Sequence, residues 1–233
     1  MGLQRVGHRG APREFPANTL RSFQRAVEHG CGMVECDIRQ AADGELVLAH
    51  DPEAQDAQGR VFDIAEQTSA FLGALDLGAG EGVPTLAELV DWALGRCAVM
   101  ADMKCEGGDV EARVVEALRP LPPSAKVVPG AGAASRLRFR ALDPALPLSL
   151  SLSTDERALL ERADLTAWLE TLDLQAVTWE HPLLAPERIA ACHARGLTVY
   201  AWTVDDLPTM RRLLSDGVDG IISNRPDLLA ELP

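Results

Sequence analysis

The chain is poor in the residues that mark nucleic-acid-binding proteins. Only 22 of its 233 residues are Lys or Arg, against 35 Asp or Glu, which gives a formal net charge of −13. Because phosphate backbones are bound chiefly through an excess of basic side chains, this balance argues against a nucleic acid partner. The sequence also has no basic cluster to hold it on an anionic membrane surface. A small phosphate ligand remains compatible, since it needs only a few local cations or one bound metal ion.

Cysteines and long apolar runs are also scarce. The five cysteines are an odd number without a CxxC pair, so they predict neither a disulfide framework nor a zinc site, but reduced and mostly buried thiols. No apolar run approaches the length of a membrane span. Met1–Arg5 leads directly into an expected strand and does not resemble a signal peptide. We therefore expect a soluble, cytoplasmic protein with no stable membrane association.

Short apolar runs alternate with amphipathic segments along the whole chain. The expected strands are Leu3–His8, Met33–Ile38, Ala98–Met103, Ala125–Val128, Leu146–Leu152, Ala176–Thr178, Thr198–Trp202 and Gly220–Ser223. The expected helices are Thr19–His29, Thr85–Gly95, Val110–Leu118, Ala133–Ala141, Thr154–Leu172, Pro186–Arg195 and Leu207–Asp216. Eight strands alternating with helices predict an α/β protein, a (β/α)8 TIM barrel. An open doubly wound sheet is the alternative, but no glycine-rich dinucleotide loop follows the first strand.

One stretch interrupts this alternation. After a tight turn, the chain continues as a short strand, Leu46–Ala49, and then as a loop region, Asp51–Gly82, that is too long for a plain connection in a compact domain. Such a stretch at one loop of a barrel usually shapes the site. Because the sequence has no internal repeat and no low-complexity linker, we predict one domain, residues 1–233, with a small insertion at about residues 51–83.

Polar residues stand at the ends of the first few expected strands. They are His8 and Arg9, Glu35 and Asp37, His50, and Asp102 and Lys104. In β/α barrels the active site gathers at the C-terminal ends of the strands. The sequence therefore predicts that three carboxylates, two imidazoles and two cations converge on one mouth.

Two of these carboxylates lie in a strand that should be buried. Glu35 and Asp37 interrupt the apolar run Met33–Ile38, and their i, i+2 spacing puts both on one face. Two like charges on a buried face repel, and desolvation makes both costly. A divalent cation removes this conflict, and carboxylate oxygens suit Mg²⁺ or Ca²⁺. With Asp102 as a third ligand from the next strand, the pattern favours a metal site over ordinary solvated carboxylates.

Taken singly, each of the histidines and cations also has a purely structural interpretation. His8 alone would more often be a core histidine, and His50 alone a loop residue. Together, at adjacent strand ends beside a metal cluster, they could supply an acid and a base. Arg9 and Lys104 beside carboxylates are either plain ion pairs or phosphate ligands. The residues themselves leave that choice open.

A series of short motifs runs through the chain in a fixed order. The motifs are His8-Arg9-Gly10-Ala11-Pro12, Pro16-Ala17-Asn18-Thr19, Glu35-Cys36-Asp37, Asp43-Gly44, His50-Asp51, Val199-Tyr200-Ala201-Trp202-Thr203-Val204, Asp216-Gly217-Val218-Asp219-Gly220-Ile221-Ile222 and Arg225-Pro226. This series resembles the signature of the glycerophosphodiester phosphodiesterase family, of the phospholipase-C-like phosphodiesterase superfamily. The match extends from residue 8 to residue 226.

The resemblance implies a β/α barrel with a small insertion after the second strand. It implies hydrolysis of glycerophosphodiesters to glycerol 3-phosphate and an alcohol, a reaction of lipid and glycerol metabolism. His8 and His50 would be the acid–base pair, either water or the neighbouring glycerol hydroxyl would attack, and the Mg²⁺ or Ca²⁺ cofactor would be held by the three carboxylates already named.

The resemblance also implies roles for other residues at the mouth. Arg9 and Lys104 would contact the phosphate of this small-molecule substrate. Trp202 and Trp179, at later strand ends, would either form an apolar wall for the alcohol or belong to the barrel core. Neither the alcohol nor the preferred ion follows from these residues, and the sequence leaves open whether the chain forms a homo-oligomer.

Three positions depart from the family pattern. Ala17 stands where the family has Glu, Asp102 where it usually has Glu, and Ser223-Asn224 where Thr-Asp is often found. A catalytically weakened barrel that only binds phosphodiesters is therefore one alternative. A lysophospholipase D acting on a lipid is another, because the insertion offers apolar residues for a patch near the mouth. Those residues are Phe62, Ile64, Phe71, Leu72, Leu75 and Leu77.

Overall fold

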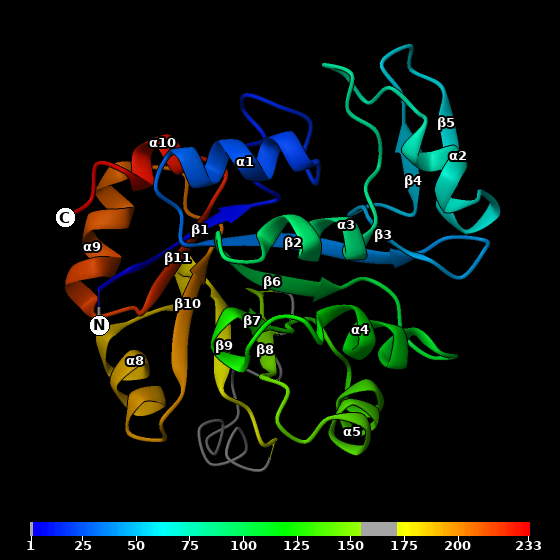
Figure 1. The fold of residues 1–233 in the computed structure, drawn as a ribbon. Coiled ribbons are helices and arrows are strands. Elements are labelled where there is room, and N and C mark those ends of the chain that lie inside the picture. The colour runs from blue at the N-terminus through cyan, green and yellow to red at the C-terminus, as the bar shows by residue number, and fades with distance from the viewer. Residues whose placement is uncertain (1, 155–171) are drawn as a thin grey trace.

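A ring of parallel strands forms the centre of the computed structural model, which describes residues 2–154 and 172–233 (Figure 1). Within those residues the ring has eight strands, β1 (Gln4–His8), β2 (Met33–Gln40), β6 (Ala98–Met103), β7 (Lys126–Val127), β8 (Ser149–Leu152), β9 (Ala176–Glu180), β10 (Thr198–Trp202) and β11 (Gly220–Ser223). Their order in space is β7-β6-β2-β1-β11-β10-β9-β8. A parallel bridge between Val128 and Leu148 links the two end strands, so the barrel is nearly closed. The predicted β/α barrel is confirmed.

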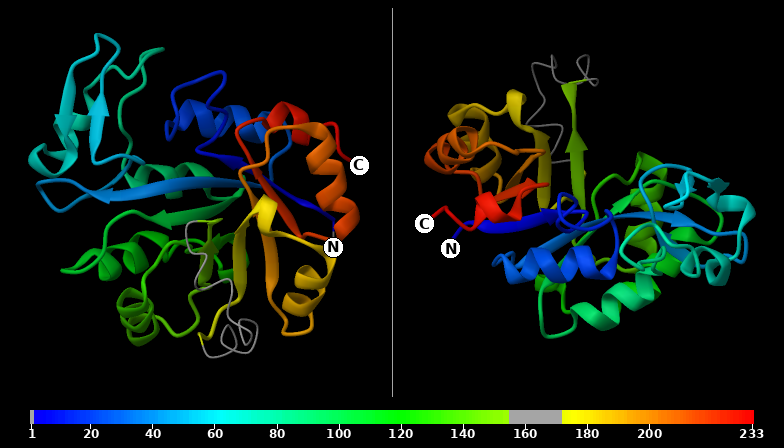
Figure 2. Two further views of the ribbon diagram at one scale, coloured as in Figure 1. Left: turned by 180° about the vertical axis from the view of Figure 1, so that it is seen from behind. Right: turned by 90° about the horizontal axis from the view of Figure 1, so that it is seen from above.

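Helices cover the outside of this ring (Figures 1 and 2). They are α1 (Leu20–Glu28), α3 (Leu86–Ala93), α4 (Val110–Leu118), α5 (Ala133–Leu142), α8 (Pro186–His193), α9 (Leu207–Asp216) and the short α10 (Pro226–Leu229). Capping explains several of their starts: Thr19 accepts a hydrogen bond from the Ser22 amide, and Thr85 forms a capping box with Glu88. The predicted helix Thr154–Leu172 lies almost entirely outside the described residues.

A small apolar layer fills the inside of the barrel. It consists of Val6, Met33, Met100, Val127, Ala176, Tyr200 and Ile222, with Ala98 and Trp202 packed against it. Side chains two positions further along a strand face the same way and lie one layer higher. This places His8 above Val6, and Glu35 above Met33. The strand pattern that fills the barrel therefore also aims the polar residues into its mouth.

The insertion stands to one side of the barrel (Figure 2). The strand β3 (Leu46–Leu48), which pairs antiparallel with β2, leads into it. The insertion itself contains a hairpin of β4 (Glu53–Gln55) and β5 (Val61–Asp63), and the short helix α2 (Ser69–Gly73). Ile64 and Leu72 are buried in a separate apolar cluster there, whereas Phe71 is 40% exposed. Most of the insertion's apolar residues thus serve its own small core.

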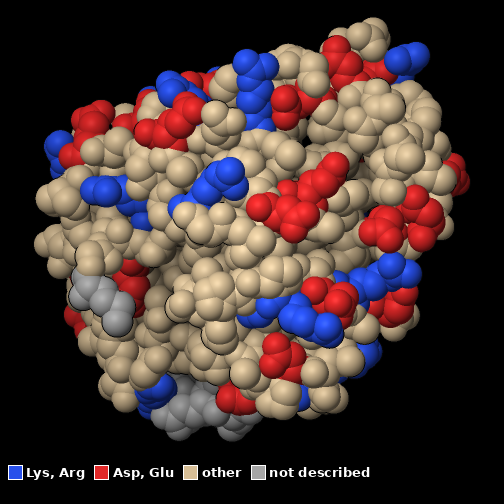
Figure 3. Space-filling view, in the orientation of Figure 1, with Lys and Arg blue, Asp and Glu red and all other residues tan. Residues whose placement is uncertain are grey.

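The surface carries both signs of charge. On the face shown in Figure 3, Lys and Arg side chains are interspersed with Asp and Glu. No helix in the described ranges is both long and apolar enough to cross a membrane.

Candidate active site

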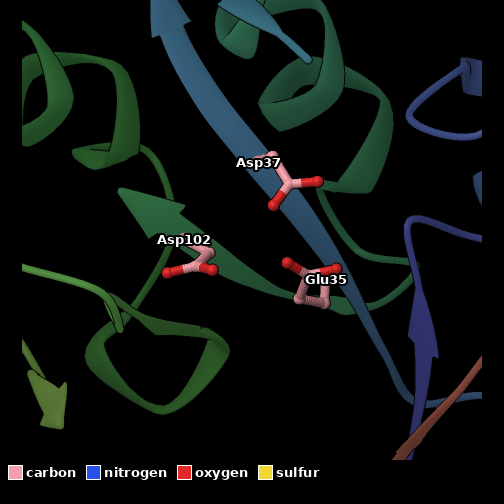
Figure 4. A group of neighbouring side chains, drawn as sticks. All are labelled: Glu35, Asp37 and Asp102. Atoms are coloured by element: carbon pink, nitrogen blue, oxygen red, sulfur yellow. The ribbon is translucent and has the colours of Figure 1, made fainter. Parts of the chain in front are cut away.

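Strand register brings the predicted carboxylates together. His8 pairs with Glu35 across β1 and β2, and Asp37 pairs with Asp102 across β2 and β6. Figure 4 shows the carboxylates of Glu35, Asp37 and Asp102 turned toward a common space between these strands. One oxygen from each of the three residues lies within 4.8 Å of the other two. Side chains on two neighbouring strands thus form the compact acidic cluster that the sequence predicted.

This cluster is largely buried, and burial acts differently on its three carboxylates. Glu35 is 4% exposed and Asp37 is 1% exposed. Burial, together with the charges of Asp37 and Asp102, raises the pKa of Glu35 well above its usual range. Burial also raises the pKa of Asp102. For Asp37, burial opposes ionisation, but Arg9 and Lys104 outweigh it and lower the pKa.

Arg9 and Lys104 lie against the cluster and also line the mouth. Arg9 Nε is 2.9 Å from Asp37 Oδ2, and Lys104 Nζ is 2.6 Å from Asp102 Oδ2 and 3.2 Å from Asp37 Oδ1. Both residues face the cavity described below. The two interpretations of Arg9 and Lys104 from sequence, as ion pairs or as phosphate ligands, are therefore compatible. Each cation can contact a carboxylate on one side and a phosphate in the cavity on the other.

One oxygen of the acidic cluster lacks a hydrogen-bond partner among the described residues and could bind a cation. Asp102 Oδ1 is buried and accepts no hydrogen bond from any described residue. A buried carboxylate oxygen without a partner is costly unless a cation approaches it. Three carboxylates with no sulfur or imidazole among them form an all-oxygen set, which suits Mg²⁺ or Ca²⁺. The residues present therefore fit a divalent metal ion.

Both predicted histidines reach the same mouth. His8 Nε2 lies 3.8 Å from Glu35 Oε2. Burial and the neighbouring Arg9 lower the pKa of His8 to about 4, so the ring is neutral near pH 7 and can accept a proton. His50 is more exposed, and its Nδ1 lies 2.8 Å from Asp51 Oδ1. Arg39 donates two hydrogen bonds to the backbone oxygen of His50, which anchors the loop that carries it.

A cavity of about 630 Å³ opens at this mouth. Its lining includes His8 and His50 on one side, and Ser151, Thr178 and Trp202 on strands of the other side. The structure brings every predicted site residue to this cavity except Asp37, whose carboxylate lies beneath Arg9 and Lys104.

The two tryptophans at the later strand ends differ. Trp202 lines the cavity, whereas Trp179 is fully buried in the layer between sheet and helices, beneath the guanidinium of Arg188. Ala176 faces the barrel interior and Thr178 the cavity, so strand alternation turns Trp179 outward. Trp179 is a core residue, and of the two tryptophans only Trp202 lines the mouth.

The loop after β1 has a backbone that few residues tolerate. Arg9 has φ +56° and Gly10 has φ +88°. A Cβ at Gly10 would lie 2.4 Å from the backbone carbon of Ser22, so no other residue fits without movement. In this conformation the Arg9 amide donates to Glu35 Oε2 at 3.0 Å. The turn therefore helps to hold one of the cluster carboxylates.

Several residues that shape the site were not singled out from sequence. Asn18, with φ +60°, donates from Nδ2 to Asp37 Oδ2 at 2.9 Å and accepts from the Asp37 amide at 3.2 Å. Gly130, in the loop after β7, lets that loop pass over Asp102: a Cβ there would lie 2.0 Å from Asp102 Oδ1. In the sequence Asn18 precedes Thr19, the N-cap of α1, and nothing in that position indicates its contact with Asp37.

A nearly closed ring of parallel strands with titratable side chains at their carboxyl ends is typical of a β/α-barrel enzyme. Comparison with known proteins narrows this class. The chain belongs to the glycerophosphoryl diester phosphodiesterase family, whose model matches residues 8–118 and 130–228. It is accordingly a phosphoric diester hydrolase.

Individual relatives agree with this assignment. A glycerophosphodiester phosphodiesterase of Caldanaerobacter subterraneus is 27% identical, over 97% of this chain and 96% of its own. A Mycobacterium tuberculosis protein provisionally named glycerophosphodiester phosphodiesterase 2 is 31% identical, over 97% of this chain and 89% of its own. The fold is shared with a phosphodiesterase from Oleispira antarctica, solved with the product sn-glycerol 3-phosphate. That match has a TM-score of 0.86 and 24% identity, and covers 98% of this chain and 95% of the other.

Proposed function

We propose that the chain hydrolyses glycerophosphodiesters to glycerol 3-phosphate and an alcohol, with a divalent ion, Mg²⁺ or Ca²⁺, held by Glu35, Asp37 and Asp102. The observation that carries the proposal is the cluster of three carboxylate oxygens within 4.8 Å of one another, in a mouth that also holds two histidines. Family membership and the glycerol 3-phosphate bound to the Oleispira antarctica phosphodiesterase support the substrate class.

The proposed acid–base pair is His8 and His50. His8 is neutral and close to the acidic cluster, which suits the base that removes a proton from the attacking hydroxyl. His50, with Asp51 on its Nδ1, suits the acid that protonates the departing alkoxide. When bound, the metal ion would neutralise charge on the phosphodiester as it develops in the transition state.

The remaining proposed roles concern binding. Arg9 and Lys104 would contact phosphate oxygens while keeping their carboxylate partners. Trp202, which lines the cavity, would form a wall of the alcohol site.

An activity screen tests this function. The purified protein is incubated with glycerophosphocholine, glycerophosphoethanolamine, lysophosphatidylcholine and bis-p-nitrophenyl phosphate, each with Mg²⁺, Ca²⁺ or Mn²⁺ and with a chelator. We expect glycerol 3-phosphate from the first two substrates, lost on chelation and restored by adding metal. Hydrolysis of lysophosphatidylcholine alone would instead indicate a lysophospholipase D.

Calorimetry on the same samples separates catalysis from binding. Metal-dependent binding of glycerophosphocholine with no product after long incubation would show a barrel that binds phosphodiesters without hydrolysing them. Such a result would contradict the proposal and would trace to the departures Ala17 and Asp102.

A further inference from the structure

A chain of hydrogen bonds runs behind His8, on the side away from the acidic cluster. His8 Nδ1 lies 2.7 Å from Asn224 Oδ1. The Asn224 side chain donates in turn from Nδ2 to Asp205 Oδ2 at 2.8 Å, and its backbone amide donates to Asp205 Oδ1 at 2.8 Å. Ser223 Oγ, fully buried, donates to the same Asp205 oxygen at 3.0 Å. The carboxylate of Asp205 thus collects three donors from the end of β11.

Chemistry fixes the direction of every bond in this chain. A carboxylate only accepts hydrogen bonds, so the NH₂ group of Asn224 must face Asp205. The Asn224 carbonyl oxygen must then face His8, and because that oxygen also only accepts, His8 Nδ1 has to carry the hydrogen. In a neutral imidazole the other nitrogen then has the lone pair. That nitrogen, Nε2, is the one beside Glu35.

We propose that Asn224 and Asp205 are positioning residues that set the tautomer of His8, so that Nε2 presents its lone pair at the mouth. The proposal rests on the proposed function, in which His8 is the base. Neither residue is among those that line the described cavity, so both act through His8 and not on the substrate. They come from two adjacent segments, since Asp205 precedes α9 and Asn224 follows β11.

These hydrogen bonds also give a reason for one departure from the family pattern, Asn224 in place of Asp. An Asp at position 224 would put a second carboxylate at hydrogen-bond distance from Asp205, where two like charges repel. An amide can donate to Asp205 and accept from His8 at once. Asn at position 224 is therefore compatible with Asp205 next to it, whereas Asp at position 224 would repel it.

The first measurement is made on the wild-type protein, and one variant serves only to assign the signals. The protein is labelled with nitrogen-15 histidine, and the His8 signals are assigned by their loss in His8→Gln. The two-bond nitrogen–proton correlation pattern distinguishes the two neutral tautomers. We expect the Nδ1–H form for His8 in the wild type. A wild-type His8 that carries its hydrogen on Nε2 overturns the proposal, whatever the activity.

The second measurement uses two variants and a matched control. In Asn224→Leu, which has a similar volume but no hydrogen-bonding groups, we expect kcat to fall by about 10- to 100-fold, less than the loss of the imidazole itself would cause, with KM changed less than about twofold. Asp205→Asn should act in the same direction, because Asn224 is then free to flip. Asp206→Asn removes an equal charge next door and retains a residue able to cap α9, so it should leave kcat unchanged.

The outcomes separate this inference from the proposed function. If His8→Gln loses activity while Asn224→Leu and Asp205→Asn retain wild-type kcat, the positioning role is wrong and the acid–base role stands. If His8→Gln retains wild-type turnover, the acid–base assignment fails. The tautomer in the wild-type spectrum still decides the hydrogen-bond direction in that case. A mixture of tautomers in Asn224→Leu together with the lower kcat would support both.

Discussion

Strands β1, β2 and β6 build one half of the barrel mouth, and strands β8, β9 and β10 build the opposite half, from different kinds of side chain. In the first half the strands contribute the titratable residues His8, Glu35 and Asp102 to the cavity lining, beside Met100 and Met103. In the second half the strands contribute Ser151, Thr178 and Trp202, none of them charged. Strand register sets Glu35 beside His8 but Asp37 beside Asp102. Ion pairs of Arg9 and Lys104 with these two aspartates lower the cost of burying them.

The two halves therefore differ in what they can do: one holds charged groups in fixed positions, and the other shapes the cavity. Charge that must be held rigidly lies on adjacent strands, whose spacing is fixed by backbone hydrogen bonds. Shape and weak hydrogen bonding lie across the mouth, where a variable alcohol would be placed. We expect substitutions in the charged half to affect turnover and those in the other half to affect substrate preference.

The largest effect is expected at the histidines of the charged half. His8→Ala or His50→Ala should lower kcat by about two to four orders of magnitude, because each removes one of the two proposed proton-transfer groups. Steady-state kinetics with glycerophosphocholine measures this loss, and circular dichroism checks the fold. Wild-type-like turnover in His50→Ala would remove that residue from the mechanism.

Next in size is the backbone turn that carries Arg9. Gly10→Ala should lower the free energy of unfolding by about 3–4 kcal/mol, because it adds a clash with Ser22 to the cost of a left-handed conformation. Gly30→Ala is the matched control. Gly30 has a similar φ of +90° but open space around its Cβ position, so about 1–2 kcal/mol is expected. Equal losses in urea denaturation would show that the close approach to Ser22 is unimportant.

An ion pair between a buried carboxylate and a half-exposed arginine joins helices α4 and α5. Glu111 on α4 accepts from Arg138 on α5 at 2.7 Å. Burial opposes ionisation of Glu111, but the hydrogen bond from Arg138 and those from the other donors around the carboxylate, among them the Gly107 amide, together outweigh it and lower the pKa from 4.5 to about 2. The stabilisation is therefore present above about pH 4.5 and is lost as the pH falls toward 2.

Denaturation at several pH values tests this pair. Glu111→Gln should cost about 2 kcal/mol at pH 7, and its difference from wild type should shrink as the pH falls from 5 to 2. The exposed residue Glu116, paired with Arg119, serves as control, and Glu116→Gln should cost less than about 0.5 kcal/mol. A Glu111→Gln deficit that stays constant with pH would contradict the lowered pKa.

The acidic cluster should respond more mildly to a single neutral substitution. Asp102→Asn keeps the side-chain volume but removes one charged ligand, so Mg²⁺ affinity should fall by about tenfold or more. Titration calorimetry with Mg²⁺ measures it. Asp109→Asn, which removes an equal charge from an exposed ion pair with Arg113, should leave the affinity unchanged.

The smallest effect is expected in the uncharged half. Thr178 Oγ1 lies 2.8 Å from Ser151 Oγ, and both residues line the cavity. Thr178→Val should change kcat/KM by less than about tenfold, but it should alter the ratio between glycerophosphocholine and glycerophosphoethanolamine. A loss as large as that of His8→Ala would show that the two halves do not divide their tasks in this way.

The ring and the charged half could be predicted largely from the sequence. Short apolar runs between amphipathic segments mark the strands, and Glu35 and Asp37 stand out because they interrupt such a run. Since parallel strands end on one side of a barrel, residues at neighbouring strand ends can be placed together before any coordinates are known.

The second half of the mouth and the supporting contacts were harder to foresee. Trp179 and Trp202 both stand near strand ends, and only the register of each strand decides which faces the cavity. Asn224 reaches His8 across 216 positions of sequence, a contact that exists only because β11 closes against β1. The hairpin of the insertion has strands of three residues, too short for alternation to be recognised.

The joint between β7 and β8 is the weakest point of the ring, because a single bridge, Val128 to Leu148, links the two strands. Backbone amides there should exchange with deuterium sooner than those between β2 and β6, which are paired over six residues. The loop that follows β7 carries Gly130, which lies directly on Asp102. Transient separation of these two strands would therefore loosen the wall over the acidic cluster first. A ligand bound in the mouth would then slow deuterium uptake at a place that it does not touch.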